Sequence, residues 1–189
     1  MKNTKTNENL NIAVKYSGFD TLKEALEAHR AWVFGEAGGK CANFSRADLS
    51  GANLSHAYLS GANLIGANLK FADLSGAYLS NAYLRGANLS DTNLSCANLS
   101  RANLNDAYLC RANLIGANLS GANLKFADLS GAYLSHANLS GANLSGAKLE
   151  YASLRRTNLS HANLHGARIK NANLCGANIE DAKLKNDLS

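Results

Sequence analysis

A repeat of five residues fills most of this chain and limits what the chain can fold into. One large apolar residue recurs at every fifth position from Phe44 to Leu184, which makes 29 consecutive copies. The large residue is almost always leucine, and the residue two positions before it is almost always alanine. The exceptions are Phe44, Ile169 and Ile179 at the first position and Thr92 and Thr157 at the second.

A period of five is incompatible with both a helix and a straight strand. An α-helix turns about 100° per residue, so a leucine at every fifth residue would leave no apolar stripe along the helix. In a straight strand the side chains alternate between two faces, so Leu49 and Leu54 would point to opposite faces. The pattern therefore predicts a short extended segment followed by a corner, repeated, with alanine and leucine always directed inward. The other three positions, mostly Asn, Ser and Gly, are then directed to solvent.

Copies such as Ala52-Asn53-Leu54-Ser55 resemble the pentapeptide-repeat family, whose motif is A-(D/N)-L-x-x. The resemblance covers about three quarters of the chain. It implies an all-β solenoid, a right-handed quadrilateral β-helix with four repeats per coil and about seven coils. At the usual interstrand spacing, such a rod is roughly 35 Å long. Each coil buries its apolar residues only against its neighbours, so the stability is expected to be a sum over neighbouring coils.

The first 40 residues lie outside the repeat and are predicted to form an N-terminal cap. Residues 1–11 are polar, so we expect them to be disordered. In the segment 12–40, alternation around Val14 predicts a short strand, and the pair Thr21 and Glu24 indicates a capping box at the start of a helix over about 21–34. The repeat region is expected to span 41–186, followed by a tail over 187–189.

The predicted helix carries an apolar face, which we expect to cover the open end of the first coil. The residues of that face are Leu22, Leu26, His29, Trp32 and Val33. His29 and Trp32 lie one helical turn apart, but no further ligand or catalytic partner accompanies them. We interpret them as a partly buried cap residue beside an aromatic anchor rather than as a functional site.

The sequence contains no recognisable targeting or membrane-spanning segment. The polar N-terminus lacks the apolar core of a signal peptide, and no run approaches the roughly 18 apolar residues of a membrane span. The four cysteines fall at outward positions, and Cys96 and Cys175, which share a side, lie four coils apart. That separation, about 19 Å, is too long for a disulfide bond. We therefore expect free thiols, a cytoplasmic protein and no membrane partner.

The sequence does not predict an enzyme. The recurring serines have no histidine or acid placed regularly beside them, and no His, Cys or Asp set shows metal-ligand spacing. Each glycine within the array belongs to the repeat, so there is no phosphate-binding loop. Because leucine and alanine fill the interior, no ligand pocket is expected. We predict no catalytic residue, no metal site and no cofactor.

The formal net charge of +5 is distributed unevenly over the four sides. Assigning successive repeats to successive sides places most of the excess on the side whose inward residues include Phe44, Leu64 and Leu84, which we call the basic side. Its candidate contact residues are Arg46, Tyr83, Arg85, Lys125, Phe126, Lys183 and Lys185. The only acid on this side is Asp106. Cations with aromatic residues between them are typical of a surface that holds a polyanion.

Three functions remain open at this stage. The first is a non-enzymatic module for protein interaction or scaffolding, with a protein partner. The second is binding of nucleic acid or another polyanion on the basic side. The third follows from the resemblance, because some members of the family mimic DNA and bind gyrase. Such mimicry requires an acidic rod, whereas residues 41–189 contain 13 basic and nine acidic side chains. We also expect a homodimer through the exposed edge of the C-terminal coil.

Overall fold

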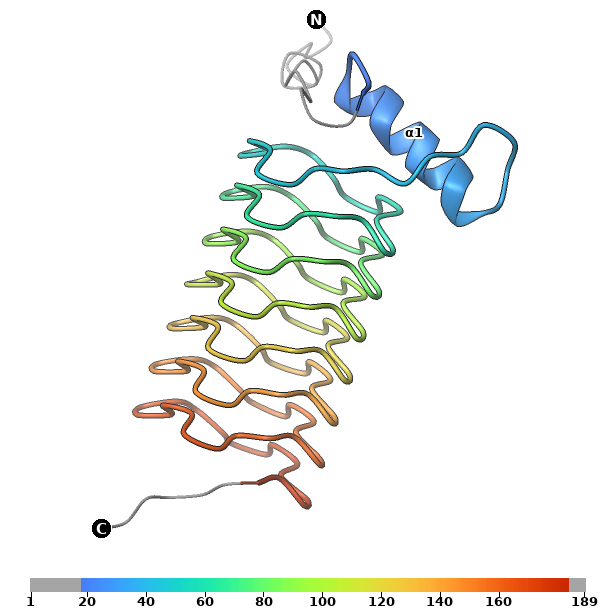
Figure 1. The fold of residues 1–189 in the computed structure, drawn as a ribbon. Helices are drawn as coiled ribbons and strands as arrows, with labels where there is room; N and C mark the ends of the chain where they lie inside the picture. The colour runs from blue at the N-terminus through green and yellow to red at the C-terminus, as the bar shows by residue number, and fades with distance from the viewer. Residues whose placement is uncertain (1–17, 184–189) are drawn as a thin grey trace, which may run out of the picture.

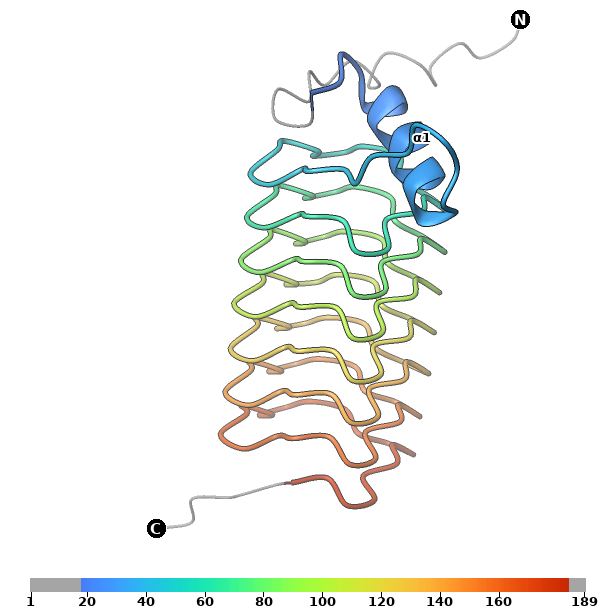
Figure 2. The same ribbon diagram turned by 45° about the vertical axis from the view of Figure 1, so that its right-hand side comes forward.

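The computed structural model describes residues 18–183, which form one helix followed by a long solenoid (Figures 1 and 2). Helix α1 spans Leu22–Val33 and lies at the N-terminal end, over one edge of the first coil. The coils follow one another along a single axis, and each is built from short extended segments and turns. The tail predicted at 187–189, the disorder predicted at 1–11 and the strand predicted around Val14 lie outside the described residues.

The coils stack with a constant register of twenty residues. In each repeat, the outward residue directly before the inward leucine forms a parallel bridge with the residue twenty positions later. These bridges run from Asn43↔Asn63 to Asn163↔Lys183. A typical bridge consists of the Leu54 N–H donating to the Asp73 carbonyl at 2.7 Å and the Asp73 N–H donating to the Ala52 carbonyl at 2.9 Å. Twenty residues are four repeats, so the predicted four-sided coil is confirmed.

A tight turn at the end of each repeat forms the corner of the coil. In the first one, the Ala47 N–H donates to the Phe44 carbonyl at 3.0 Å, and Arg46 has φ of 59°. In a type II turn, only the third of the four residues has a positive φ. Glycine is the least strained residue at that third position. Every corner from 46 to 181 has a positive φ, yet sixteen of them carry a residue other than glycine. The fold therefore tolerates backbone strain at the corners so that they can present varied side chains.

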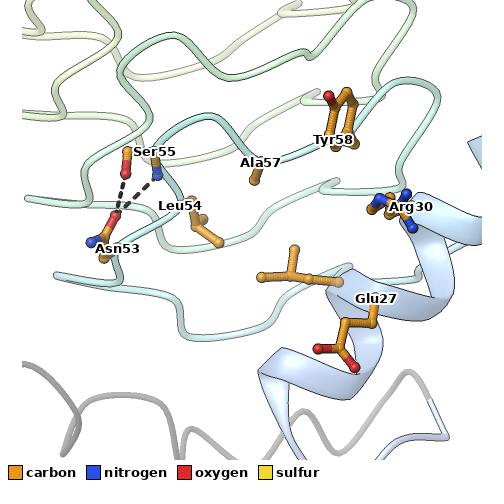
Figure 3. Close-up of a pocket in the computed structure, with 8 residues that line it drawn as sticks. Glu27, Arg30, Asn53, Leu54, Ser55, Ala57 and Tyr58 are labelled. Atoms are coloured by element: carbon orange, nitrogen blue, oxygen red, sulfur yellow. Dashed lines mark hydrogen bonds between the residues drawn. The ribbon is translucent and has the colours of Figure 1, made fainter.

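The asparagine of the repeat has a structural role that was not predicted from the sequence pattern. The Asn53 Oδ1 accepts a hydrogen bond from the Ser55 N–H at 3.1 Å (Figure 3). The same bond recurs along the rod wherever Asn or Asp occupies this position, for example from the Ser130 N–H to Asp128 at 3.1 Å. This local bond holds the backbone in the conformation that leads into the turn.

The interior of the solenoid is filled by the alanine and leucine columns, which are almost completely buried from Ala42 to Leu164. Two buried threonines replace alanine, and their hydroxyls donate to carbonyls of the preceding coil: Thr92 to Leu69 and Thr157 to Leu134, both at 2.8 Å. Toward the C-terminal end of the described residues the inward side chains become more accessible, and Ile179 is 48% exposed. The dimer through this end stays a prediction.

Helix α1 begins with the capping box predicted from the sequence. The Glu24 N–H donates to the Thr21 Oγ1 at 3.1 Å, and the Thr21 N–H donates to the Glu24 Oε2 at 3.2 Å. The helix buries Leu22, Ala25 and His29, which lie on one face because they are three or four positions apart.

Two expectations about the cap were wrong. Trp32 does not cover the end of the coil, because 45% of its surface is exposed and its ring lies beside Gly61 on the flank of the first coil. His29 is fully buried rather than partly buried. It hydrogen-bonds to the first coil on two sides, which explains why a polar residue occupies the buried face of the helix.

Candidate interaction face

The structure places the described candidate residues on one long side of the rod. Because residues twenty apart lie above one another, Arg85 and Lys125 occupy one column, two coils apart. At the usual interstrand spacing this is about 9.6 Å along the axis. Tyr83 and Lys183 share the column on one flank, and the corner column on the other flank holds Arg46 and Phe126. All six side chains are exposed, and Lys185 lies outside the described residues.

The side that follows the basic side along each coil, which we call the next side, differs from the basic side in how its charges are paired. On the next side, Arg111 Nε and Nη2 donate to the two carboxylate oxygens of Asp91 at 2.7 and 2.8 Å. The other pairs on that side are Lys148 with Asp128 at 3.1 Å and Arg168 with Glu150 at 2.6 Å. Among residues 18–183, no ion pair involves a cation of the basic side.

Two acids of the next side, Asp91 and Asp128, have a lowered pKa, which favours their ionised form. The hydrogen bond from Arg111 lowers the pKa of Asp91. Burial opposes ionisation of Asp128, but hydrogen bonds from Ser130, Lys148 and Cys110 outweigh it and lower the pKa of Asp128 to about 2. These acids stay negative at neutral pH and compensate the cations beside them. The basic side has only Asp106, whose carboxylate hydrogen-bonds to the side chain of Asn105.

A shallow groove of about 530 Å³ lies on the basic side, between Lys125 and His165. Its lining includes the Phe126 ring, Gly146 and Gly166. The Lys125 ammonium lies 4.9 Å from the centre of the Phe126 ring, which extends over Gly146 in the following coil. A β-carbon at residue 146 would lie 2.5 Å from that ring, so the glycine makes room for it. His165 and the two glycines were not predicted to belong to this surface.

Replacing Gly146 by alanine should lower the free energy of unfolding more than the same replacement at Gly86. Both glycines are corner residues of one column, with φ of 66° and 64°, so both substitutions strain the backbone by about 1 kcal/mol. Only alanine at 146 also displaces the Phe126 ring, because nothing lies within 4 Å of a β-carbon at 86. We expect an additional loss of about 0.5–1 kcal/mol in urea unfolding. Equal losses would show that the Phe126 ring is not packed on Gly146.

A second, smaller cavity of about 240 Å³ lies between α1 and the first coil (Figure 3). Its lining includes Leu26, Leu54 and Ala57, with Arg30 and Tyr58 at its edge. An aromatic cluster closes this region, because Phe34 contacts Tyr58 edge-on at 5.0 Å and Tyr58 stacks on Tyr78 at 4.9 Å. The cavity offers no pair of side chains suited to acid–base or nucleophilic chemistry, so we interpret it as a packing gap of the cap.

Among residues 18–183, no group of three or more His, Cys, Asp or Glu side chains lies close enough together to hold a metal ion. The four cysteines are not paired with one another. Within the same range, α1 is too short and too polar to cross a bilayer.

The twenty-residue register and the buried alanine and leucine columns define a four-sided solenoid of parallel coils. The chain belongs to the pentapeptide repeat family, because eight copies of that family's sequence profile, described as Pentapeptide repeats, match it between residues 42 and 186. Its fold is therefore a right-handed quadrilateral β-helix, as predicted. A search among curated proteins found no match.

Solved structures of the same family resemble the chain. A pentapeptide repeat protein from the thylakoid lumen of Arabidopsis thaliana is 38% identical over 55% of this chain and 72% of its own, with a TM-score of 0.53. HetL from Nostoc sp. strain PCC 7120, described as involved in the regulation of heterocyst differentiation, is 35% identical over 77% of this chain and 78% of its own, with a TM-score of 0.39. QnrB1, a plasmid-mediated fluoroquinolone resistance protein, is 23% identical over 76% and 82%, with a TM-score of 0.43.

Proposed function

We propose that this protein is a non-enzymatic interaction or scaffolding module whose basic side contacts a protein partner in the cytoplasm. The observation that carries the proposal is the difference in charge pairing between two adjacent sides of one rod. On the next side, Arg111, Lys148 and Arg168 are paired with acids about one coil away, whereas Lys70 and Lys170 form no ion pair among the described residues. The exposed cations of the basic side, such as Arg85 and Lys125, have no such partner among the described residues. Uncompensated charge on a rigid face favours binding of a complementary surface.

The interior supports a role that does not involve catalysis. The side chains that face inward over most of the rod are apolar and buried, so the solenoid encloses no site where a substrate would be desolvated. The outward serines recur as parts of the turns, and no histidine or acid is placed regularly beside them in the repeat. The basic side is therefore a surface for contact rather than for chemistry.

Nucleic acid is the second candidate partner, favoured by the exposed rings of Tyr83 and Phe126 beside the cations. The cations are sparse for this purpose, because a single strand of a duplex carries a phosphate about every 3.4 Å. A role like that of QnrB1 is less favoured, since the likeness at 23% identity extends to the fold alone and the repeat region here is net positive.

Site-directed photo-crosslinking in a lysate of the source organism tests the proposal. A photoreactive residue at Asn105 lies on the basic side, and one at Ser95 occupies the equivalent repeat position on another side. We expect protein adducts from position 105 that withstand nuclease, and few from position 95. The double variant Arg85→Gln with Lys125→Gln should reduce them. Adducts that disappear with nuclease would indicate nucleic acid instead, and equal adducts from both positions would contradict a specific face.

A further inference from the structure

We propose that the basic side binds an acidic peptide segment in the polyproline II conformation, lying along the rod axis with a carboxylate at every third residue. The inference rests on the proposed function and names the chemistry of the partner. It is carried by the spacing of the basic and histidine side chains, by the hydrogen bonding of the coil backbone and by the residues between and beside the cations.

The spacing comes from the register of the coils. Arg46, Arg85, Lys125 and His165 lie in the first, third, fifth and seventh coils, so one such side chain occurs in every second coil over the first seven, and Lys183 follows in the eighth. Two coils span about 9.6 Å. Three residues of polyproline II span about 9.3 Å, and that helix returns to the same face after three residues. Over three such steps the two periods drift apart by only about 1 Å, which flexible Arg and Lys side chains absorb.

Other extended polymers fit this spacing less well. A β-strand repeats each face after about 6.7 Å, so its side chains would fall out of step with the cations within one interval. A nucleic-acid strand presents about three phosphates for each interval between cations, which leaves most of them uncompensated. A carboxylate at every third residue of polyproline II offers one partner to each of Arg46, Arg85 and Lys125.

The backbone of the basic side is not available for strand addition. The Leu104 N–H donates to the Asn123 carbonyl at 2.7 Å, and the Asn123 N–H donates to the Ala102 carbonyl at 2.9 Å. A partner must therefore bind through side chains alone. Polyproline II suits this arrangement, because it has no internal hydrogen bonds and its backbone stays exposed to donors. Asn123 accepts from the Lys125 N–H through Oδ1, which leaves its amide hydrogens free to donate to a peptide carbonyl.

The residues around the cations add specificity. Tyr83 is 53% exposed on one flank and Phe126 is 55% exposed on the other, and exposed rings are the usual platforms for the prolines of a polyproline II segment. Asp106 lies in the coil between Arg85 and Lys125. It repels a carboxylate at that level, so it disfavours a peptide with adjacent acids and permits one with spaced acids.

Two labelled peptides of the same composition test the inference by fluorescence anisotropy. One contains four repeats of Glu-Pro-Pro, and in the other the four glutamates are adjacent. We expect the spaced peptide to bind several-fold more tightly to the wild-type protein. The double variant Arg85→Gln with Lys125→Gln should weaken that binding by roughly three- to tenfold. The control variant Arg155→Gln with Lys170→Gln makes the same charge change at equivalent repeat positions on the other sides and should bind like the wild type.

A third variant tests the role of Asp106. Asp106→Asn should strengthen binding of the adjacent-glutamate peptide and reduce the preference for the spaced one. Equal binding of both peptides, equal losses in both double variants, or no binding of the spaced peptide would overturn the inference. Tighter binding of an oligothymidylate than of the spaced peptide would do the same. Protein adducts at position 105 without peptide binding would retain the proposed function and reject this partner chemistry.

Discussion

Replacing Leu114 by alanine should lower the free energy of unfolding by about 3–4 kcal/mol. Leu114 is completely buried in the middle of the rod, in an inward column that also contains Leu94 and Leu134 one coil away on either side. Truncation removes buried apolar surface and leaves a cavity that the rigid coils cannot close. Because each coil is stabilised only by its neighbours, the loss falls on both coil interfaces that Leu114 fills. Urea unfolding followed by circular dichroism measures the effect.

Leu174→Ala is the matched control for this prediction. Leu174 lies in the same inward column but is only partly buried, near the C-terminal end of the described residues. Less contact is lost there, so we expect about half the effect of Leu114→Ala. A broader transition or a changed denaturant dependence in the Leu114 variant would indicate that the two halves of the rod unfold separately. Equal losses at both positions would contradict a core whose packing is tightest in the middle.

The sequence predicts the solenoid well because one constraint determines it. A large apolar residue at every fifth position, with alanine two before it, is satisfied only by a coil that turns once per repeat. The position of each outward residue then follows by counting, which is why Arg85 and Lys125 were assigned to one side correctly. The roles of the outward residues did not follow from the pattern. The hydrogen bond that the Ser55 N–H donates to Asn53 Oδ1 depends on backbone geometry that the sequence does not express.

The groove on the basic side was missed because it depends on how corner side chains extend along the rod. Arg46, the first corner residue, extends over Gly66 one coil later. The same pattern recurs at the three remaining corner arginines, and each of them is followed twenty residues later by a glycine. These pairs are Arg101 with Gly121, Arg111 with Gly131 and Arg156 with Gly176. A large corner residue with glycine twenty positions later was therefore a readable signal, and Phe126 with Gly146 is an instance of it.

The two wrong predictions about the cap have a different origin. Helical periodicity placed Trp32 on the apolar face, but its ring lies beside Gly61 on the flank of the first coil. The ring stacks on His29, with the ring centres 5.3 Å apart. His29 occupies the buried position instead. It hydrogen-bonds to the Ala42 N–H and the Ser60 carbonyl of the first coil, which an apolar side chain would leave without a partner.

The stability of the cap should decrease as the pH falls below about 6.5. His29 Nδ1 accepts a hydrogen bond from the Ala42 N–H at 2.9 Å, and Nε2 lies 3.1 Å from the Ser60 carbonyl, to which it donates. Only the neutral ring satisfies both bonds. Burial lowers the pKa of His29, and the bond to Ser60 opposes this only in part. The undocked histidine therefore binds a proton more readily than the docked one. Its contribution is complete above the unfolded pKa and is lost as the pH falls toward the folded one.

Trp32 reports on this contact directly, because it is the only tryptophan in the chain and stacks on His29. We expect its fluorescence to change together with the loss of cap stability in a titration from pH 8 to pH 5. His29→Phe should remove this pH dependence and lower the stability by about 2–3 kcal/mol at pH 7.5, since the Ala42 N–H and the Ser60 carbonyl lose their partner. His136→Phe changes an exposed corner histidine and should retain the wild-type titration. A His29 variant with the wild-type pH dependence would show that another group destabilises the protein in acid.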